Sequence, residues 1–188
     1  KNIAKRYMSG KNHTQAVLKQ ALAIFDGMKK VHGMGARERL LLQIAVILHD
    51  CGNYISMSNA SQCAYEIIMS TEIIGLSHGE RELIANVVKS IKMPFQYYCA
   101  PDSKAAIDRE TYMRAAKLTA IIRVANVLDR SHKQKVEEMT AVVREHQLIM
   151  TVTAKEDLTL ERGLLKESAD FFEEIFSLRP VLKKKKQK

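Results

Sequence analysis

The sequence lacks the features that mark secreted and membrane proteins. Its three cysteines, Cys51, Cys63 and Cys99, are scattered and form no CxxC pair, so a disulfide framework is not expected. No apolar run approaches the ~18 residues needed to cross a bilayer, and no signal-peptide pattern opens the chain. Internal repeats are also absent, as is any low-complexity stretch apart from a group of lysines at the end. These absences predict an intracellular, cytoplasmic protein without a membrane segment.

Positive charge is in excess, but much of it lies at one end of the chain. The formal net charge of the 188 residues is +9, and the lysines at positions 183–186 and 188 supply five of these charges. A basic balance favours polyanionic partners such as polyphosphate, nucleotides or nucleic acid. The terminal lysines have two interpretations. They form either a solvated, disordered tail or a nucleic-acid-binding segment whose affinity falls steeply with salt.

Apolar periodicity predicts a mainly helical fold. With 46% hydrophobic residues, the chain can pack one domain, or one domain with an appendage. Three- and four-residue spacing of apolar side chains predicts helices over residues 12–30, 40–52, 60–70, 77–91, 108–128 and 158–176. Ser77 and Glu80 form a capping-box pattern, and Asp108 stands at an N-cap position. Gly52 is expected to end the second helix in a left-handed conformation.

The end of the chain changes from a helical to an alternating pattern. Alternating polarity over residues 139–144 and 147–153 predicts a β-hairpin before the last helix. Residues 93–102 are expected to form a loop, in which Tyr97 and Tyr98 either border a pocket or anchor the loop. The predicted fold class is therefore mainly α, with a small C-terminal β-hairpin plus helix.

Side chains of the type that bind metals stand at the ends of three predicted helices. The second helix delivers His49 and Asp50 to the edge of the core, because the residues before them are almost all apolar. His13 opens the first helix, and Asp129 follows the fifth. If these helix ends converge, the four side chains form a mixed nitrogen and oxygen set suited to Mn, Fe, Zn, Co or Ni.

Several of these residues also have a purely structural interpretation. His13 alone would be a surface or capping histidine, and Asp129 alone would be an ion-pair partner of Arg123 or Arg130. Cys51 is interpreted as a small buried hydrophobe rather than a ligand. Arg130 and His132 are candidates for phosphate binding, because arginine contacts phosphate through two parallel hydrogen bonds.

The chain resembles the HD superfamily of metal-dependent phosphohydrolases, which combine a histidine, a buried His-Asp pair and a distant aspartate. It resembles more closely the carboxyl-terminal HD domain of the exopolyphosphatase and guanosine pentaphosphate phosphatase family (Ppx/GppA). The segments that carry this resemblance are LLLQIAVILHDCGNYIS, IIGLSHGERELIA, KLTAIIRVANVLDRSH and LTLERGLLKESADFFEEIF. It extends over residues 12–176. It implies that His13, His49, Asp50 and Asp129 bind a divalent metal such as Mn, Fe, Zn, Ni or Mg.

The resemblance also implies a domain organisation. Residues 1–135 are expected to form an HD-type helical bundle, residues 136–180 a β-hairpin and helix appendage packing on it, and residues 181–188 a basic tail. In this family an actin-like phosphatase domain precedes the HD domain. Because the chain begins at Lys1 rather than methionine, we expect it to be a piece of a longer protein.

Two segments depart from the family pattern. Family members commonly carry a His-rich segment after the His-Asp helix, where this chain reads SNASQC at residues 58–63. Many also have a histidine near the end of the next helix, where this chain has Lys89-Ser90-Ile91-Lys92. The histidines that would support a second metal are therefore missing.

Three functions follow as hypotheses. The first is a non-catalytic accessory domain of a phosphoanhydride hydrolase, which helps to bind polyphosphate or a guanosine phosphate nucleotide and to assemble a homodimer. The second is an autonomous metal phosphohydrolase that uses the four HD-type residues. The third is nucleic-acid binding through the terminal lysines.

Overall fold

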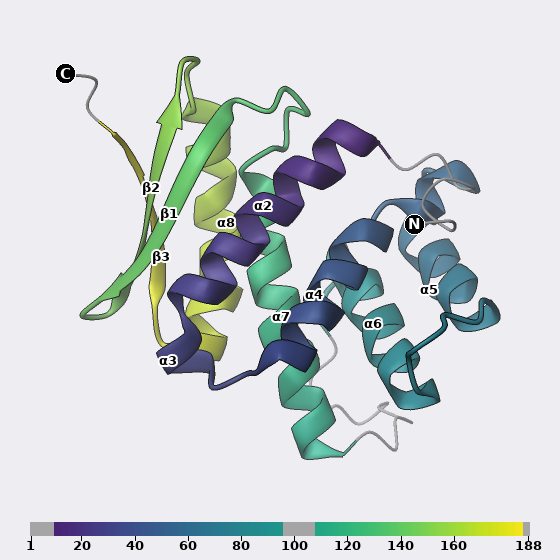
Figure 1. The fold of residues 1–188 in the computed structure, drawn as a ribbon. Coiled ribbons are helices and arrows are strands. Elements are labelled where there is room, and N and C mark those ends of the chain that lie inside the picture. Colours follow the sequence, from purple (N-terminus) through teal and green to yellow (C-terminus); the bar gives the residue numbers. More distant parts are fainter. Residues whose placement is uncertain (1–9, 96–107, 186–188) are drawn as a thin grey trace.

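The computed structural model describes residues 10–95 and 108–185 (Figure 1). The fold is mainly helical with a small sheet, in agreement with the predicted class. Its elements are α2 (Lys11–Gly27), α3 (Lys29–His32), α4 (Ala36–Leu48), the 3-10 helix η1 (Cys51–Tyr54), α5 (Ala60–Ser70), α6 (His78–Ser90), α7 (Arg109–Val127), β1 (Val136–Arg144), β2 (Gln147–Ala154), α8 (Thr159–Phe176) and β3 (Arg179–Lys184). Among the described residues, no helix combines the length and apolar character needed to span a membrane.

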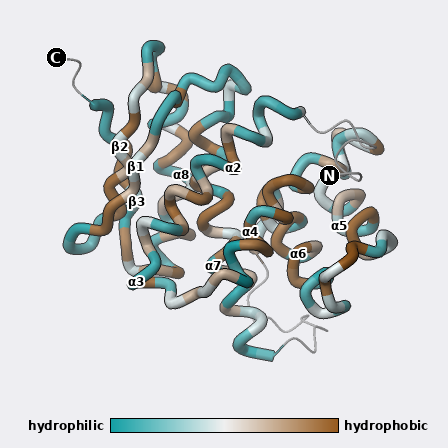
Figure 2. Tube along the Cα trace, in the orientation of Figure 1, coloured by the Kyte–Doolittle hydropathy of each residue, from teal (hydrophilic) through white to brown (hydrophobic). Residues whose placement is uncertain are grey.

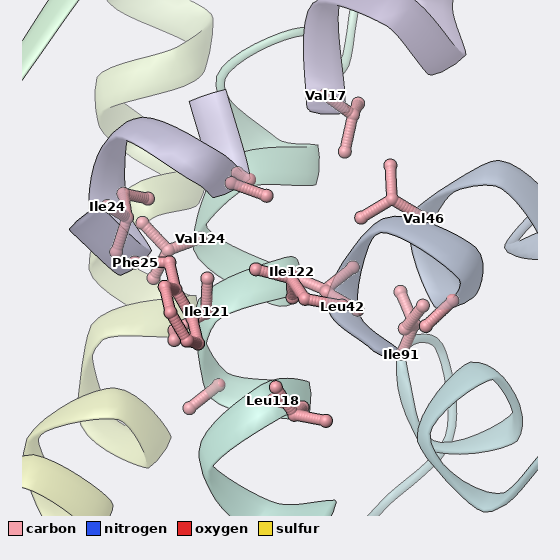
Figure 3. Packing of buried hydrophobic residues seen from close by; sticks show 14 of the residues in the cluster. Val17, Ile24, Phe25, Leu42, Val46, Ile91, Leu118, Ile121, Ile122 and Val124 are labelled. Carbon is pink, nitrogen blue, oxygen red and sulfur yellow. The ribbon is translucent and has the colours of Figure 1, made fainter. Parts of the chain in front are cut away.

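Helix α7 lies at the centre of the molecule (Figure 1). The sheet and α8 lie on one side of it, and α4 and α6 lie on the other. Its buried side chains surround the helix instead of forming one stripe. Figure 3 shows Ile121 on the side of Phe25 of α2 and Ile122 on the side of Leu42 of α4, and all four side chains are buried. This shared core holds α2, α4 and α7 together, and thereby fixes the positions of their ends.

The sheet packs against the helices through α2 and α8. Strands β1 and β2 form the predicted antiparallel hairpin, in which Arg144 pairs with Gln147. Glu145, at the hydrophilic turn between them (Figure 2), has a left-handed φ of 51°. Strand β3 lies beside β2 and runs parallel to it, which the crossover through α8 makes possible.

Strand β3 corrects the predicted start of the basic tail. Residues 181–184 were assigned to that tail by sequence, whereas Arg179–Lys184 form a strand. Its inward-facing residues are Pro180 and Leu182, and the lysines that follow are exposed. Two inward-facing side chains are too few to reveal an alternating pattern, and the lysine run conceals them further. Lys186 and Lys188 lie outside the described residues.

The helix boundaries confirm some local signals and correct others. Ser77 and Glu80 form the predicted capping box, and Asp108 caps α7 through the Thr111 N–H. The helix predicted over residues 12–30 is interrupted at Met28, which has a φ of −107°. Tyr97, Tyr98 and Cys99 lie outside the described residues, so the interpretations of that loop stay predictions.

Gly52 has a different role from the one predicted. Helix α4 ends at Leu48, and Gly52 lies within η1 without a positive φ. A Cβ atom at Gly52 would lie 1.9 Å from the carbonyl oxygen of Ala60 and 2.7 Å from the backbone nitrogen of Ala64. Close approach of the first turn of α5, rather than a left-handed conformation, therefore requires glycine here.

Candidate metal centre

Three helix ends bring the predicted ligands together. His13 lies in the first turn of α2, His49 and Asp50 follow the last turn of α4, and Asp129 follows α7. His13 Nδ1 lies 2.8 Å from Asp129 Oδ2, although 116 positions separate the two residues in the chain. His13 Nε2 lies 3.3 Å from His49 Nε2. All four predicted residues therefore meet at one place.

Three of the four offer atoms to a common point. Asp50 Oδ2 lies 3.3 Å from His49 Nε2 and 3.8 Å from His13 Nε2. Within the described part of the chain, His13, His49 and Asp50 form a group whose ligand atoms are all within 4.8 Å of one another. Neighbouring ligand atoms of a tetrahedral zinc site lie about 3.3 Å apart, since each bond is about 2.0–2.1 Å long. The donors and their spacing therefore fit a divalent cation.

The second nitrogen of each ring is held by an acceptor. His49 Nδ1 lies 2.7 Å from the Val46 carbonyl oxygen, which can only accept, so Nδ1 carries the proton and Nε2 keeps its lone pair. His13 Nδ1 faces the carboxylate of Asp129. A carbonyl or carboxylate behind each imidazole is the usual arrangement around metal-binding histidines, because it fixes the ring and its tautomer.

Asp129 contacts Nδ1 of His13, on the side of the ring away from the point that His13, His49 and Asp50 share. Its Oδ1 accepts a hydrogen bond from the Gln134 N–H at 2.7 Å, and its Oδ2 accepts one from the Gln134 side-chain amide at 3.1 Å. Sequence reasoning missed Gln134 and also Asn126, whose Oδ1 lies 3.1 Å from His13 Nε2. The only available signal for Asn126 was its place in the last turn of the predicted helix, three residues before Asp129.

Burial and charge favour the protonation states that bind cations. The most exposed of the four side chains, Asp50, belongs to a residue with only 9% exposure. Burial alone would raise the pKa of Asp50, but the charges of His49 and Lys92 outweigh it, and the pKa lies below its usual range. Burial lowers the pKa of His49, which favours the neutral imidazole, and the charge of Asp50 opposes this shift only in part. For Asp129, hydrogen bonds from His13 and Gln134 overcome burial and lower the pKa.

Lys92 adds a positive charge beside the cluster. From the sequence, this segment was noted only because it lacks a histidine that many family members have. Lys92 lies just beyond the end of α6, and its Nζ donates a hydrogen bond to Asp50 Oδ1 at 2.9 Å. The same ammonium reaches Asn53 Oδ1 at 3.4 Å. Asp50 therefore has a cationic partner within the chain.

The predicted phosphate-binding residues lie on the turn after α7. His132 stacks on His13, with ring centroids 3.8 Å apart and planes 9° from parallel. Burial, and then the charge of His13, lower the pKa of His132. Arg130 is exposed, and its guanidinium makes no hydrogen bond or ion pair with the described residues. An exposed cation thus follows directly after the buried cluster.

Comparison with protein families identifies a matching family model. A family model described as Ppx/GppA phosphatase, domain III, matches residues 1–170. The matched range includes the cluster and the turn that carries Arg130 and His132. The HD-type identity of the bundle stays a prediction. Because the match spans most of the 188 residues, the chain belongs to the Ppx/GppA phosphatase family and corresponds to its domain III.

Proposed function

We propose that this domain is an accessory module of an exopolyphosphatase- or guanosine pentaphosphate phosphatase-like protein. It helps to bind polyphosphate or a guanosine phosphate nucleotide, while an actin-like phosphatase domain of the same protein carries out hydrolysis. The observation that carries the proposal is the position of Arg130 and His132 beside the buried cluster. Guanidinium and imidazole groups both donate hydrogen bonds to phosphate oxygens.

The cluster itself is proposed to hold one divalent cation. His13, His49 and Asp50 supply the ligand atoms, and Asp129 orients His13 through its Nδ1. A bound divalent cation supplies a Lewis acid that attracts and polarises phosphoryl oxygens. Together with Arg130, it would give the phosphate chain two positive contacts from one side of the domain.

Homodimer assembly is the second part of the proposal. Ile55 and Met57 follow η1 with 57% and 82% of their surface exposed, and such neighbouring apolar side chains favour burial in an interface. Sedimentation equilibrium of the chain and of an Ile55→Ser/Met57→Ser double variant tests it. A dimer that dissociates in the variant supports this part, and a monomeric parent chain overturns it.

Polyphosphate binding by point variants tests the main proposal. Arg130→Ala is expected to weaken binding by about ten- to a hundredfold, because a hydrogen bond to a charged group contributes about 1.5–3 kcal/mol. His132→Ala is expected to weaken it less. Fluorescence anisotropy with labelled polyphosphate at low salt measures both. Arg144→Ala, which removes an exposed arginine at the end of β1, is the control. An equal loss in Arg144→Ala, or no loss in Arg130→Ala, contradicts the proposal.

An autonomous phosphohydrolase is the alternative, and the spacing of the ligand atoms of His13, His49 and Asp50 favours it. Under the leading proposal, the purified chain binds metal without releasing phosphate from polyphosphate or simple phosphoesters. Metal-dependent phosphate release that disappears in His49→Ala and Asp129→Ala would instead establish the alternative. Phosphate release that persists in both variants would point to a contaminating enzyme.

A further inference from the structure

The two carboxylate oxygens of Asp50 face different partners. Oδ2 faces Nε2 of His13 and His49, whereas Oδ1 accepts the hydrogen bond from Lys92 Nζ. The Asp50 side chain is only 10% exposed, so these protein groups, rather than water, provide most of its solvation. A fixed ammonium group therefore lies on one side of this carboxylate, and the proposed cation position lies on the other.

We propose that Lys92 is a positioning residue that acts through Asp50 and sets how tightly the cluster binds a divalent cation. This inference rests on the proposed metal site at His13, His49 and Asp50. The ammonium and a divalent ion carry charges of the same sign and share one carboxylate. Their repulsion weakens metal binding, and it is only partly screened because the carboxylate between them is buried.

The Lys92 contact also restricts how Asp50 binds. With Oδ1 engaged by the ammonium, only Oδ2 is directed at the two imidazoles. The carboxylate is thereby held as a donor of one oxygen to the proposed cation. Lys92 is held in this place from a second element, because its Nζ also reaches the side chain of Asn53 in η1.

A merely structural role for Lys92 is the competing explanation. In that case Lys92 ties the segment after α6 to η1, and its charge is irrelevant to the cluster. Substitutions that separate charge from hydrogen bonding distinguish the two roles. Lys92→Gln keeps a donor without charge, Lys92→Arg keeps both, and Lys92→Met keeps only the apolar length of the side chain.

Isothermal titration of the metal-depleted chain with Mn²⁺ and with Zn²⁺ tests the inference. Lys92→Gln and Lys92→Met are expected to bind each ion on the order of tenfold more tightly than the parent chain, because a nearby positive charge is removed. Lys92→Arg is expected to bind like the parent. Lys89→Met is the control, because it removes a nearby lysine in the last turn of α6, whose Nζ lies over the Tyr65 ring, 5.4 Å from its centroid.

The outcomes separate this inference from the proposal on which it rests. Unchanged or weaker metal binding in both Lys92→Gln and Lys92→Met, with His49-dependent binding in the parent, overturns the role of Lys92 alone. An equal gain in Lys89→Met overturns it too, since the effect would then reflect only net charge. If neither the parent nor any Lys92 variant binds metal, the cation site and this inference are both wrong. Lys92→Arg, which keeps the charge, shows whether a change at this position harms folding.

Discussion

Replacing Gly52 with alanine is expected to destabilise the protein by about 3 kcal/mol, near the upper end for overpacking a filled site. The added methyl group would overlap the Ala60 carbonyl oxygen, and the backbone nitrogen of Ala64 lies only slightly farther away. Both atoms belong to the backbone of α5, which cannot rotate aside as a flexible side chain would. Relief therefore requires η1 and α5 to separate.

Urea denaturation followed by far-ultraviolet circular dichroism measures this effect. Gly163→Ala is the matched control, because Gly163 lies inside α8, and an added Cβ would meet nothing within 4 Å other than the backbone of its own helix and its chain neighbours. That substitution is expected to stabilise the protein by up to about 1 kcal/mol through helix propensity. A free energy of unfolding for Gly52→Ala close to that of the parent chain would show that α5 can shift to make room for the methyl group without loss of stability.

Gly52 also illustrates what the sequence can and cannot predict about this fold. Signals that involve residues a few positions apart, such as the capping box of Ser77 and Glu80, appear in the structure as predicted. The reason for Gly52 lies in contact with a separate helix, which no local pattern encodes. Strand β3 was missed for the same reason, since its pairing with β2 depends on residues beyond an 18-residue helix.

In the candidate site, too, some residues could be predicted from the sequence pattern, and others depend on tertiary contacts. His13, His49, Asp50 and Asp129 were predicted because they form a recognisable pattern at helix ends, and the structure brings them together. Lys92 was not predicted, since its contact with Asp50 spans 42 positions and its residue type departs from the family pattern. The orientation of Asp129 toward the back of His13 likewise depends on tertiary packing.

The turn that carries the candidate phosphate-binding residues depends on a buried ion pair. Glu161 of α8 has 0% exposure, and its carboxylate lies 3.2 Å from Lys135 Nζ and accepts a hydrogen bond from Ser131 Oγ at 3.0 Å. Ser131 and Lys135 flank His132 in the chain. The pair therefore ties this turn to α8, and its loss is expected to affect both stability and the position of His132.

Lys135→Met is expected to destabilise the protein by about 3–5 kcal/mol, because it leaves the buried carboxylate of Glu161 without its counter-charge. A Lys135→Met/Glu161→Leu double variant should lose less, since removing both charges also removes the cost of burying one alone. Urea denaturation measures both. Lys155→Met is the control, because its ion pair with Glu137 is exposed, with 81% and 44% of the two side chains accessible, and such pairs contribute about 0–1 kcal/mol.

If Lys135→Met lowers the free energy of unfolding no more than this control does, water reaches Glu161 and other contacts hold the turn. If instead the double variant recovers stability but not polyphosphate binding, the ion pair serves to place His132 and Arg130 rather than to hold the fold together.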